Sequence, residues 1–103
     1  MIKIPYFIIS EIGLPATLEQ LAEEAAELSK AALKVARIIR KENPTPVTYE
    51  QAIANLEEEA ADVRNCLRVV CGELDIITIG TEALKMRRWA ERLAEVKGGD
   101  PDA

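Results

Sequence analysis

The sequence predicts an all-α domain built on an antiparallel hairpin of two long helices, with a shorter third helix after it. Two long segments are rich in good helix formers and lack proline. In both segments, apolar side chains recur at the three- and four-residue spacing of one helix face. The loop that joins them is short, which favours antiparallel neighbours. At 103 residues the chain buries only roughly two-thirds of its unfolded surface, so we also expect it to self-associate.

The first long helix is predicted to begin at Thr17, after an apolar N-terminal segment (residues 1–16) that Pro5 interrupts. Thr17 and Gln20 have the spacing of a capping box, in which each side chain bonds to the backbone N–H of the other residue. The helix has to end near Asn43, because prolines follow directly and cannot continue it.

The second helix is predicted to begin at another capping box, Thr48 with Gln51, and to end at about Gly72–Leu74. The segment that follows, residues 75–80, is rich in β-branched side chains. It fits a short strand, a turn or an extension of the helix.

The third helix is predicted to begin at Thr81, a further cap, and to end at Gly98. The helical domain then spans residues 17–97. Residues 98–103 are expected to form a flexible tail.

Composition narrows the functions that the chain can perform. Its net charge of −5 argues against general nucleic-acid binding, which requires a basic face. It contains no histidine, which excludes histidine-based catalytic triads and zinc sites. The apolar N-terminal run is too short to span a membrane. Cys66 and Cys71 are five residues apart, which suits neither a CxxC motif nor a disulfide, so we expect them to be small core residues of a cytoplasmic protein. Taken together, these observations predict a protein without nucleic-acid or membrane partners.

Acidic residues converge on one edge of the predicted hairpin. At about 100° per residue, Glu24 and Glu27 lie on one flank of the first helix, beside its apolar seam. Viewed down each helix from its N-terminus, Glu59 and Asp62 lie on the same side of the apolar seam in the second helix as Glu24 and Glu27 do in the first. Packing the helices antiparallel brings these flanks to one side, with the two pairs about 6 Å apart in level. The expected seams are Leu21, Ala25, Leu28, Ala32, Val35 and Ile39 in the first helix, and Ile53, Leu56, Ala60, Val63, Leu67 and Val70 in the second.

Four converging carboxylates favour a divalent metal site. Like charges repel and raise one another's pKa values, and a hard cation relieves that repulsion. Mg²⁺ takes octahedral oxygen ligands and commonly shares them between carboxylates and phosphates. The sequence therefore predicts Mg²⁺, with Mn²⁺ as a substitute. A solvated acidic flank without a metal is the alternative interpretation.

A basic stripe and an apolar face run along the predicted third helix. Lys85, Arg88 and Arg92 form the stripe, which suits the oxygens of a triphosphate. A solvated face with local acidic partners is the alternative. Trp89 belongs to the apolar face, and we expect it in the core rather than stacked on a base. The aromatic pair at residues 6–7 is a second candidate for contact with a base.

The acidic motifs carry a resemblance to a known family. Glu23-Glu24-Ala25-Ala26-Glu27 followed by Glu59-Ala60-Ala61-Asp62 resembles the EExxE…ExxD signature of the MazG-like, all-α nucleoside triphosphate pyrophosphohydrolases. The segments LAEEAAELSKAALK and KMRRWAERL look like those of a small phage-type or bacterial member. The resemblance covers residues 17–97.

The resemblance implies an Mg²⁺-dependent hydrolase that cleaves a (deoxy)nucleoside triphosphate between the α and β phosphates. The products are nucleoside monophosphate and pyrophosphate. The implied site consists of metal ligands Glu24, Glu27, Glu59 and Asp62 and phosphate-binding residues Lys85 and Arg88. Without histidine, a carboxylate has to accept the proton of the attacking water, and Glu24 or Glu27 is preferred. Members assemble their helices into bundles, so we expect a four-helix-bundle-type homo-oligomer, either a dimer or a tetramer.

Two other functions remain open at the level of the sequence. The chain fits a non-catalytic helical oligomerisation or interaction module, in which the acidic flank binds a basic partner or keeps the assembly soluble. It also fits a phosphoribosyl-ATP pyrophosphohydrolase, a related enzyme with a different substrate. Stabilisation of the fold by Mg²⁺ separates a metal site from the interaction module.

Overall fold

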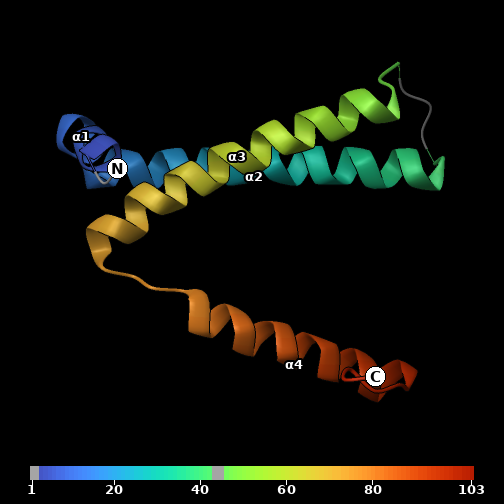
Figure 1. Cartoon of the computed structure of the whole chain (residues 1–103). Helices are drawn as coiled ribbons and strands as arrows, with labels where there is room; N and C mark the ends of the chain where they lie inside the picture. The colour runs from blue at the N-terminus through green and yellow to red at the C-terminus, as the bar shows by residue number, and fades with distance from the viewer. Residues whose placement is uncertain (1–2, 43–45) are drawn as a thin grey trace.

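The computed structural model describes residues 3–42 and 46–103, and over these residues the chain is all-α (Figure 1). The helices α2 and α3 pack as an antiparallel pair, and α1 lies against both of them at one end. The predicted all-α class and the predicted antiparallel hairpin are therefore confirmed. The helices are α1 (Lys3–Ile12), α2 (Leu14–Arg40), α3 (Tyr49–Leu74) and α4 (Ile79–Lys97).

The helix α1 is an element that the sequence-based prediction lacks. Pro5 lies in its first turn, where the missing N–H of proline costs no helical hydrogen bond. Pro5 therefore does not interrupt the apolar segment, and the segment folds as a helix. This helix buries Ile9 against the hairpin.

A single residue, Gly13, separates α1 from α2. Its φ of 85° lies in a region that glycine adopts freely and other residues rarely adopt. Pro15 follows in the first turn of α2. The predicted helix start at Thr17 is therefore wrong. Thr17 lies inside α2 with 3% of its surface exposed, and its hydroxyl donates to the Gly13 carbonyl oxygen at 2.8 Å.

The capping box at the start of α3 is confirmed. The Gln51 backbone N–H donates to Thr48 Oγ1 at 3.1 Å, and the Thr48 backbone N–H donates to Gln51 Oε1 at 2.9 Å. At the other end of the connection, α2 closes on Lys41 in a left-handed conformation. The predicted proline loop between the helices lies partly outside the described residues.

Residues 75–80 form a short loop and the first residues of α4. Asp75 ends α3 in a left-handed conformation. The helix α4 begins at Ile79 with Thr78 as its N-cap, so the predicted start at Thr81 is wrong. The Thr78 hydroxyl donates to Glu82 Oε2 at 2.5 Å. This hydrogen bond holds a negative charge in the first turn, where the helix dipole favours it.

The interface between α2 and α3 is a heptad-type seam. Its positions alternate at spacings of four and three residues, the pattern that packs knobs into holes. Ala31 and Ala52 are its most buried members, with 2% and 1% of their surface exposed. The seam consists of Thr17, Leu21, Glu24, Leu28, Ala31, Val35 and Ile38 from α2, and of Ala52, Leu56, Glu59, Val63, Cys66 and Val70 from α3.

The observed seam is rotated relative to the predicted one. Ala25, Ala32 and Ile39 were expected in the contact but are exposed, and the residue before each takes its place. The same one-residue shift replaces Ile53, Ala60 and Leu67 in α3. The physical reason is that each helix has an apolar face wider than the contact, so part of that face stays uncovered. The rotation moves Glu24 and Glu59 from the flank into the seam.

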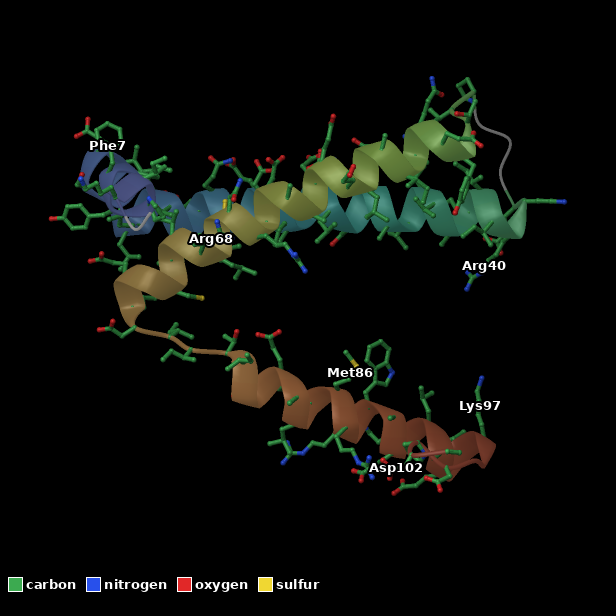
Figure 2. All side chains as sticks on the ribbon, viewed as in Figure 1. Phe7, Arg40, Arg68, Met86, Lys97 and Asp102 are labelled. Atoms are coloured by element: carbon green, nitrogen blue, oxygen red, sulfur yellow. The ribbon has the colours of Figure 1, made fainter. Side chains whose placement is uncertain are left out.

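The helix α4 stands apart from the other described helices. None of its Cα atoms lies within 8 Å of a Cα atom of α1, α2 or α3. Trp89 is 59% exposed, so its expected place in the core is wrong for the single chain. Figure 2 shows Met86 on the side of α4 that is turned toward the hairpin. The accessible surface totals 8399 Å², against about 5,800 Å² for a compact monomer of this mass.

The C-terminal tail folds back onto α4. The Arg87 guanidinium forms a bidentate ion pair with Asp102, in which Nη2 donates to Oδ2 at 2.7 Å. This pairing lowers the pKa of the Asp102 carboxyl, through the hydrogen bonds first and the opposite charge second. Gly98 ends α4 as predicted, and the flexibility of residues 98–103 stays a prediction.

Enlarging a seam alanine should destabilise the hairpin. Ala31→Leu adds a large side chain at a buried position, where overpacking costs about 1–3 kcal/mol of unfolding free energy. Urea denaturation measures this loss. Ala32→Leu is the matched control, because Ala32 is exposed on the same turn, and we expect a change below about 0.5 kcal/mol. Equal losses in the two variants would contradict the position of the seam.

Candidate metal centre

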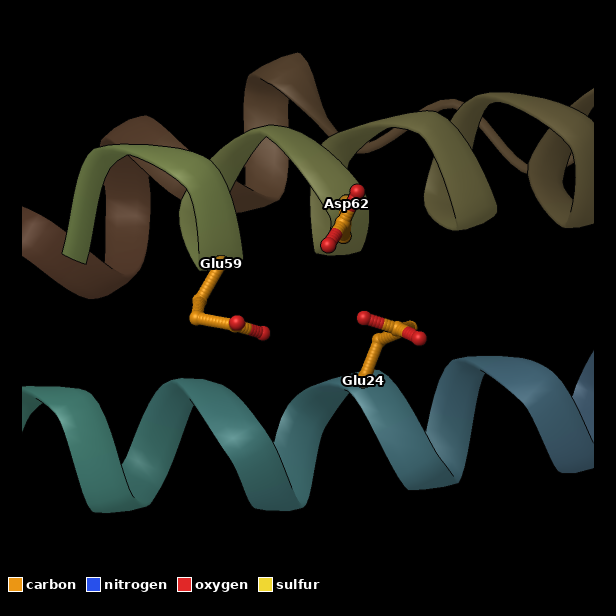
Figure 3. Close-up of side chains that lie close together, drawn as sticks. All are labelled: Glu24, Glu59 and Asp62. Atoms are coloured by element: carbon orange, nitrogen blue, oxygen red, sulfur yellow. The ribbon is translucent and has the colours of Figure 1, made fainter. Parts of the chain in front are cut away.

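The packing of α2 on α3 brings three of the predicted carboxylates together. Glu24 from α2 and Glu59 and Asp62 from α3 each offer one oxygen, and these oxygens all lie within 4.8 Å of one another. Figure 3 shows Glu59 from α3 and Glu24 from α2 extending into the space between the two helices, with Asp62 on the neighbouring turn of α3. Glu24 and Glu59 are partly buried, whereas Asp62 is exposed at the edge of the seam.

Partial burial and nearby negative charges both act on Glu59. Partial burial raises the pKa of its carboxyl above the ordinary value of 4.5, and the charges of Asp62 and Glu24 raise it further. Smaller contributions of the same sign come from Glu27 and Glu58. The cluster therefore disfavours full ionisation unless a cation or a proton is present.

The fourth predicted ligand, Glu27, lies beside this group rather than in it. Its carboxylate pairs with Lys30 Nζ at 3.6 Å, and both side chains are more than half exposed. An exposed pair of this kind contributes little to stability. The charge of Glu27 still raises the pKa of Glu59, so it belongs to the same electrostatic neighbourhood.

Two polar neighbours of the cluster were missed by sequence reasoning. Gln20, expected in an N-terminal cap, donates from Nε2 to Glu24 Oε1 at 2.8 Å. Cys66 carries a free thiol in the seam, and its burial and the charges of Glu24 and Asp62 raise the pKa of that thiol. The available signal was spacing. Gln20 precedes Glu24 by four residues and Cys66 follows Asp62 by four, which puts each on the face of its acidic neighbour.

The predicted phosphate-binding residues do not join the cluster within one chain. Lys85 and Arg88 are exposed on α4, which contacts none of the other described helices. Neither of them belongs to an ion pair between described residues. Their charges are thus unneutralised by the part of the chain that the structure describes.

The three carboxylates fit a hard divalent cation. Mg²⁺ binds oxygen at about 2.1 Å, and oxygens within 4.8 Å of one another reach one ion after small side-chain rotations. Proteins usually hold Mg²⁺ with few carboxylates and leave other positions to water and phosphate. The exposed side of Asp62 gives access of that kind. The donor set therefore suits Mg²⁺, or Mn²⁺, shared with a polyphosphate.

Comparison with protein-family models, with curated proteins and with solved structures finds no match. The pyrophosphohydrolase family suggested by the acidic motifs therefore stays a prediction. None of the described helices combines the length and the apolar character needed to cross a lipid bilayer.

In the metal-free protein, ionisation of Glu59 should lower the free energy of unfolding as the pH rises above 4.5. The raised pKa means that folded Glu59 keeps its proton to a higher pH than unfolded Glu59. The folded state then binds more protons in that range, so the free energy of unfolding falls with rising pH. Urea denaturation in EDTA at a series of pH values measures this for the wild type and Glu59→Gln. We expect the variant to lack this part of the decrease.

Addition of Mg²⁺ should restore the stability that ionisation of Glu59 removes. We expect the Tm of the wild type to rise with Mg²⁺ concentration at neutral pH, because the ion binds only the folded chain. Glu59→Gln should show little rise, whereas Glu57→Gln, an exposed α3 control, should behave as the wild type. Identical Mg²⁺ responses in all three proteins would contradict the metal centre.

Proposed function

We propose that this protein is an Mg²⁺-dependent nucleotide pyrophosphohydrolase of the MazG-like class. The reaction converts a (deoxy)nucleoside triphosphate and water into nucleoside monophosphate and pyrophosphate. One observation carries the proposal: Glu24, Glu59 and Asp62, members of the two acidic motifs, converge from separate helices. The order and spacing within those motifs add to it, since they resemble the signature of that family.

The carboxylates have two roles in this proposal. Glu24, Glu59 and Asp62 hold the cation, and Gln20 orients Glu24 through its hydrogen bond. When bound, Mg²⁺ neutralises charge on the triphosphate and acidifies water. Glu27 lies outside the ligand group and is our first candidate to accept the proton of the water that attacks the α phosphorus. The bond from that phosphorus to the bridging oxygen breaks, and pyrophosphate leaves.

We also propose that the active form is a homo-oligomer, either a dimer or a tetramer. The chain exposes roughly 2,600 Å² more than a compact monomer of its mass, an area comparable with that buried in stable interfaces. Packing α4 of one copy on the uncovered side of another copy's hairpin would bury both apolar faces. Lys85 and Arg88 of one copy are then candidates to bind phosphates at the cluster of the other. The apolar face of α4 exposes Met86, Trp89, Leu93 and Val96, and Leu84 is exposed on the opposite side of the helix.

Product analysis tests the reaction. A panel of ribo- and deoxynucleoside triphosphates is incubated with the protein in Mg²⁺ or in EDTA, and we expect monophosphate and pyrophosphate only with the metal. Glu59→Gln should lower kcat/KM by about 100-fold or more, since residues that merely support metal ligands already cost about 10–100-fold. Circular dichroism checks that the helices persist.

The matched control for this experiment is Glu57→Gln, which removes the same charge from an exposed position on α3. It should leave turnover unchanged. Release of diphosphate and orthophosphate would contradict the proposed bond cleavage. Full activity of Glu59→Gln would contradict the ligand assignment.

A charge on the apolar face of α4 should disrupt the oligomer. Trp89→Glu places a carboxylate among the exposed apolar residues, where burial in an interface costs far more than exposure to water. We expect the mass measured by light scattering to fall toward that of one chain. Leu84→Glu is the control, because it adds the same charge on the opposite side of α4. A wild type that is monomeric, or a Trp89→Glu variant with unchanged mass, would contradict the interface.

A non-catalytic interaction module is the second candidate function. The uncovered apolar face of α4 favours it, since exposed apolar patches mark sites of protein–protein contact. Oligomerisation without turnover and without stabilisation by Mg²⁺ would support this alternative over the enzyme.

A further inference from the structure

A groove between α1 and α3 lies near the candidate metal centre. Its volume is about 820 Å³, within the usual range for small-molecule sites. Figure 2 shows Arg68 on the part of α3 that runs toward α1. The groove is lined by Lys3, Pro5, Tyr6 and Ile9 from α1 and by Arg68, Val69, Gly72 and Glu73 from α3.

The groove has an apolar floor that a glycine keeps open. Ile9 and Val69 are both buried. A Cβ atom added to Gly72 would meet no atom within 4 Å, so the space above this residue is free. Glycine weakens the interior of a helix, and here its effect is to leave room for a ligand.

The rim of the groove supplies an aromatic ring and unneutralised cations. Tyr6 is largely exposed, and its ring can stack on a flat heterocycle. Lys3 and Arg68 form no ion pair with any described residue, so both can attract an anionic ligand or donate to it. Glu73 adds a hydrogen-bond acceptor at the same rim. An apolar floor with a few polar groups at its edge is typical of a site for an organic ligand.

The register of α3 connects the groove to the metal centre. Val69 follows Asp62 by seven residues, so the two lie on the same face of the helix, about 10 Å apart along its axis. Glu73 follows Glu59 by fourteen residues, nearly four turns, and lies within about 40° of it around the helix axis. A ligand that begins in the groove and runs along this face reaches the carboxylates.

We propose that the groove binds the nucleoside part of the substrate whose phosphates meet the metal centre. The base stacks on Tyr6 and lies over Gly72, and Arg68 and Lys3 bind acceptor atoms of the base, sugar or nearest phosphate. This inference rests on the proposed function and deepens it, because it assigns the residues that hold the nucleoside. Inorganic tripolyphosphate, which lacks a nucleoside, should accordingly be a poor substrate.

Filling the groove tests this assignment through kinetics. Gly72→Leu places a side chain in the open space, and Gly80→Leu is the matched control, because its added Cβ also meets nothing within 4 Å but lies on α4. With the best nucleotide of the panel, we expect Gly72→Leu to raise KM about tenfold or more with kcat little changed, the pattern of lost ground-state binding. The control should match the wild type. Equal KM values in the three proteins, or tripolyphosphate turnover as efficient as nucleotide turnover, would overturn the inference.

A binding experiment separates this inference from the proposed function. Nucleosides without phosphate are titrated into isotope-labelled protein in EDTA, and amide NMR shifts are followed. We expect shifts at residues 3–9 and 68–73 in the wild type and Gly80→Leu, and none in Gly72→Leu. Absence of these shifts in an active wild type overturns the groove and leaves the enzyme. Their presence in a protein without turnover upholds the groove and overturns the enzyme.

Discussion

Glu24 and Glu59 occupy positions of the α2–α3 seam that apolar residues fill in an ordinary antiparallel hairpin. Partial burial and the charges of Asp62 and Glu24 both raise the pKa of Glu59 and so work against its ionised form. Ala31 and Ala52 keep the two helices close, so the carboxylates cannot simply separate. The hairpin therefore holds three acidic side chains near one another at a cost in stability that only a proton or a cation removes. Our proposal of a divalent metal site depends on this composition of the seam.

The convergence of the carboxylates was predictable because it depends on symmetry more than on detail. If both helices of an antiparallel pair rotate about their axes in the same direction, each viewed from its N-terminus, the acidic sides of the two helices still face the same edge of the pair. The seam that we expected was displaced by one residue at every second position of each helix, yet Glu24, Glu59 and Asp62 still meet. The displacement itself was not predictable, because a helical wheel finds the centre of the apolar face. The contact occupies only one side of that face, and Ala25 and Ala32 remain outside it.

The start of a helix could be predicted from the sequence only where no second residue nearby could also begin the helix. Thr48 and Gln51 form both hydrogen bonds of the capping box, and no other capping residue lies between Pro46 and the start of α3. At Thr17 the same pattern lost to Gly13, whose φ of 85° separates α1 from α2 and lets α2 begin at Leu14, three residues before Thr17. The groove between α1 and α3 could not be foreseen for a related reason. It exists only because α1 is a helix and lies against α3, and the sequence pattern left the state of that segment open.

The separate position of α4 has a consequence for the exchange of its amide hydrogens with solvent. Without packing against α1, α2 or α3, the backbone of α4 is protected, among the described residues, by its own hydrogen bonds, by the Thr78–Glu82 contact and by the pairing of Arg87 with Glu91 and Asp102. An isolated helix of this length is marginally stable in water, so its amides exchange through local opening rather than through global unfolding. The amides of α3 exchange more slowly, since that helix is held by the seam. In an assembly that covers α4, the two helices become similarly protected, and the rate of deuterium uptake along α4 reports how much of the protein is assembled.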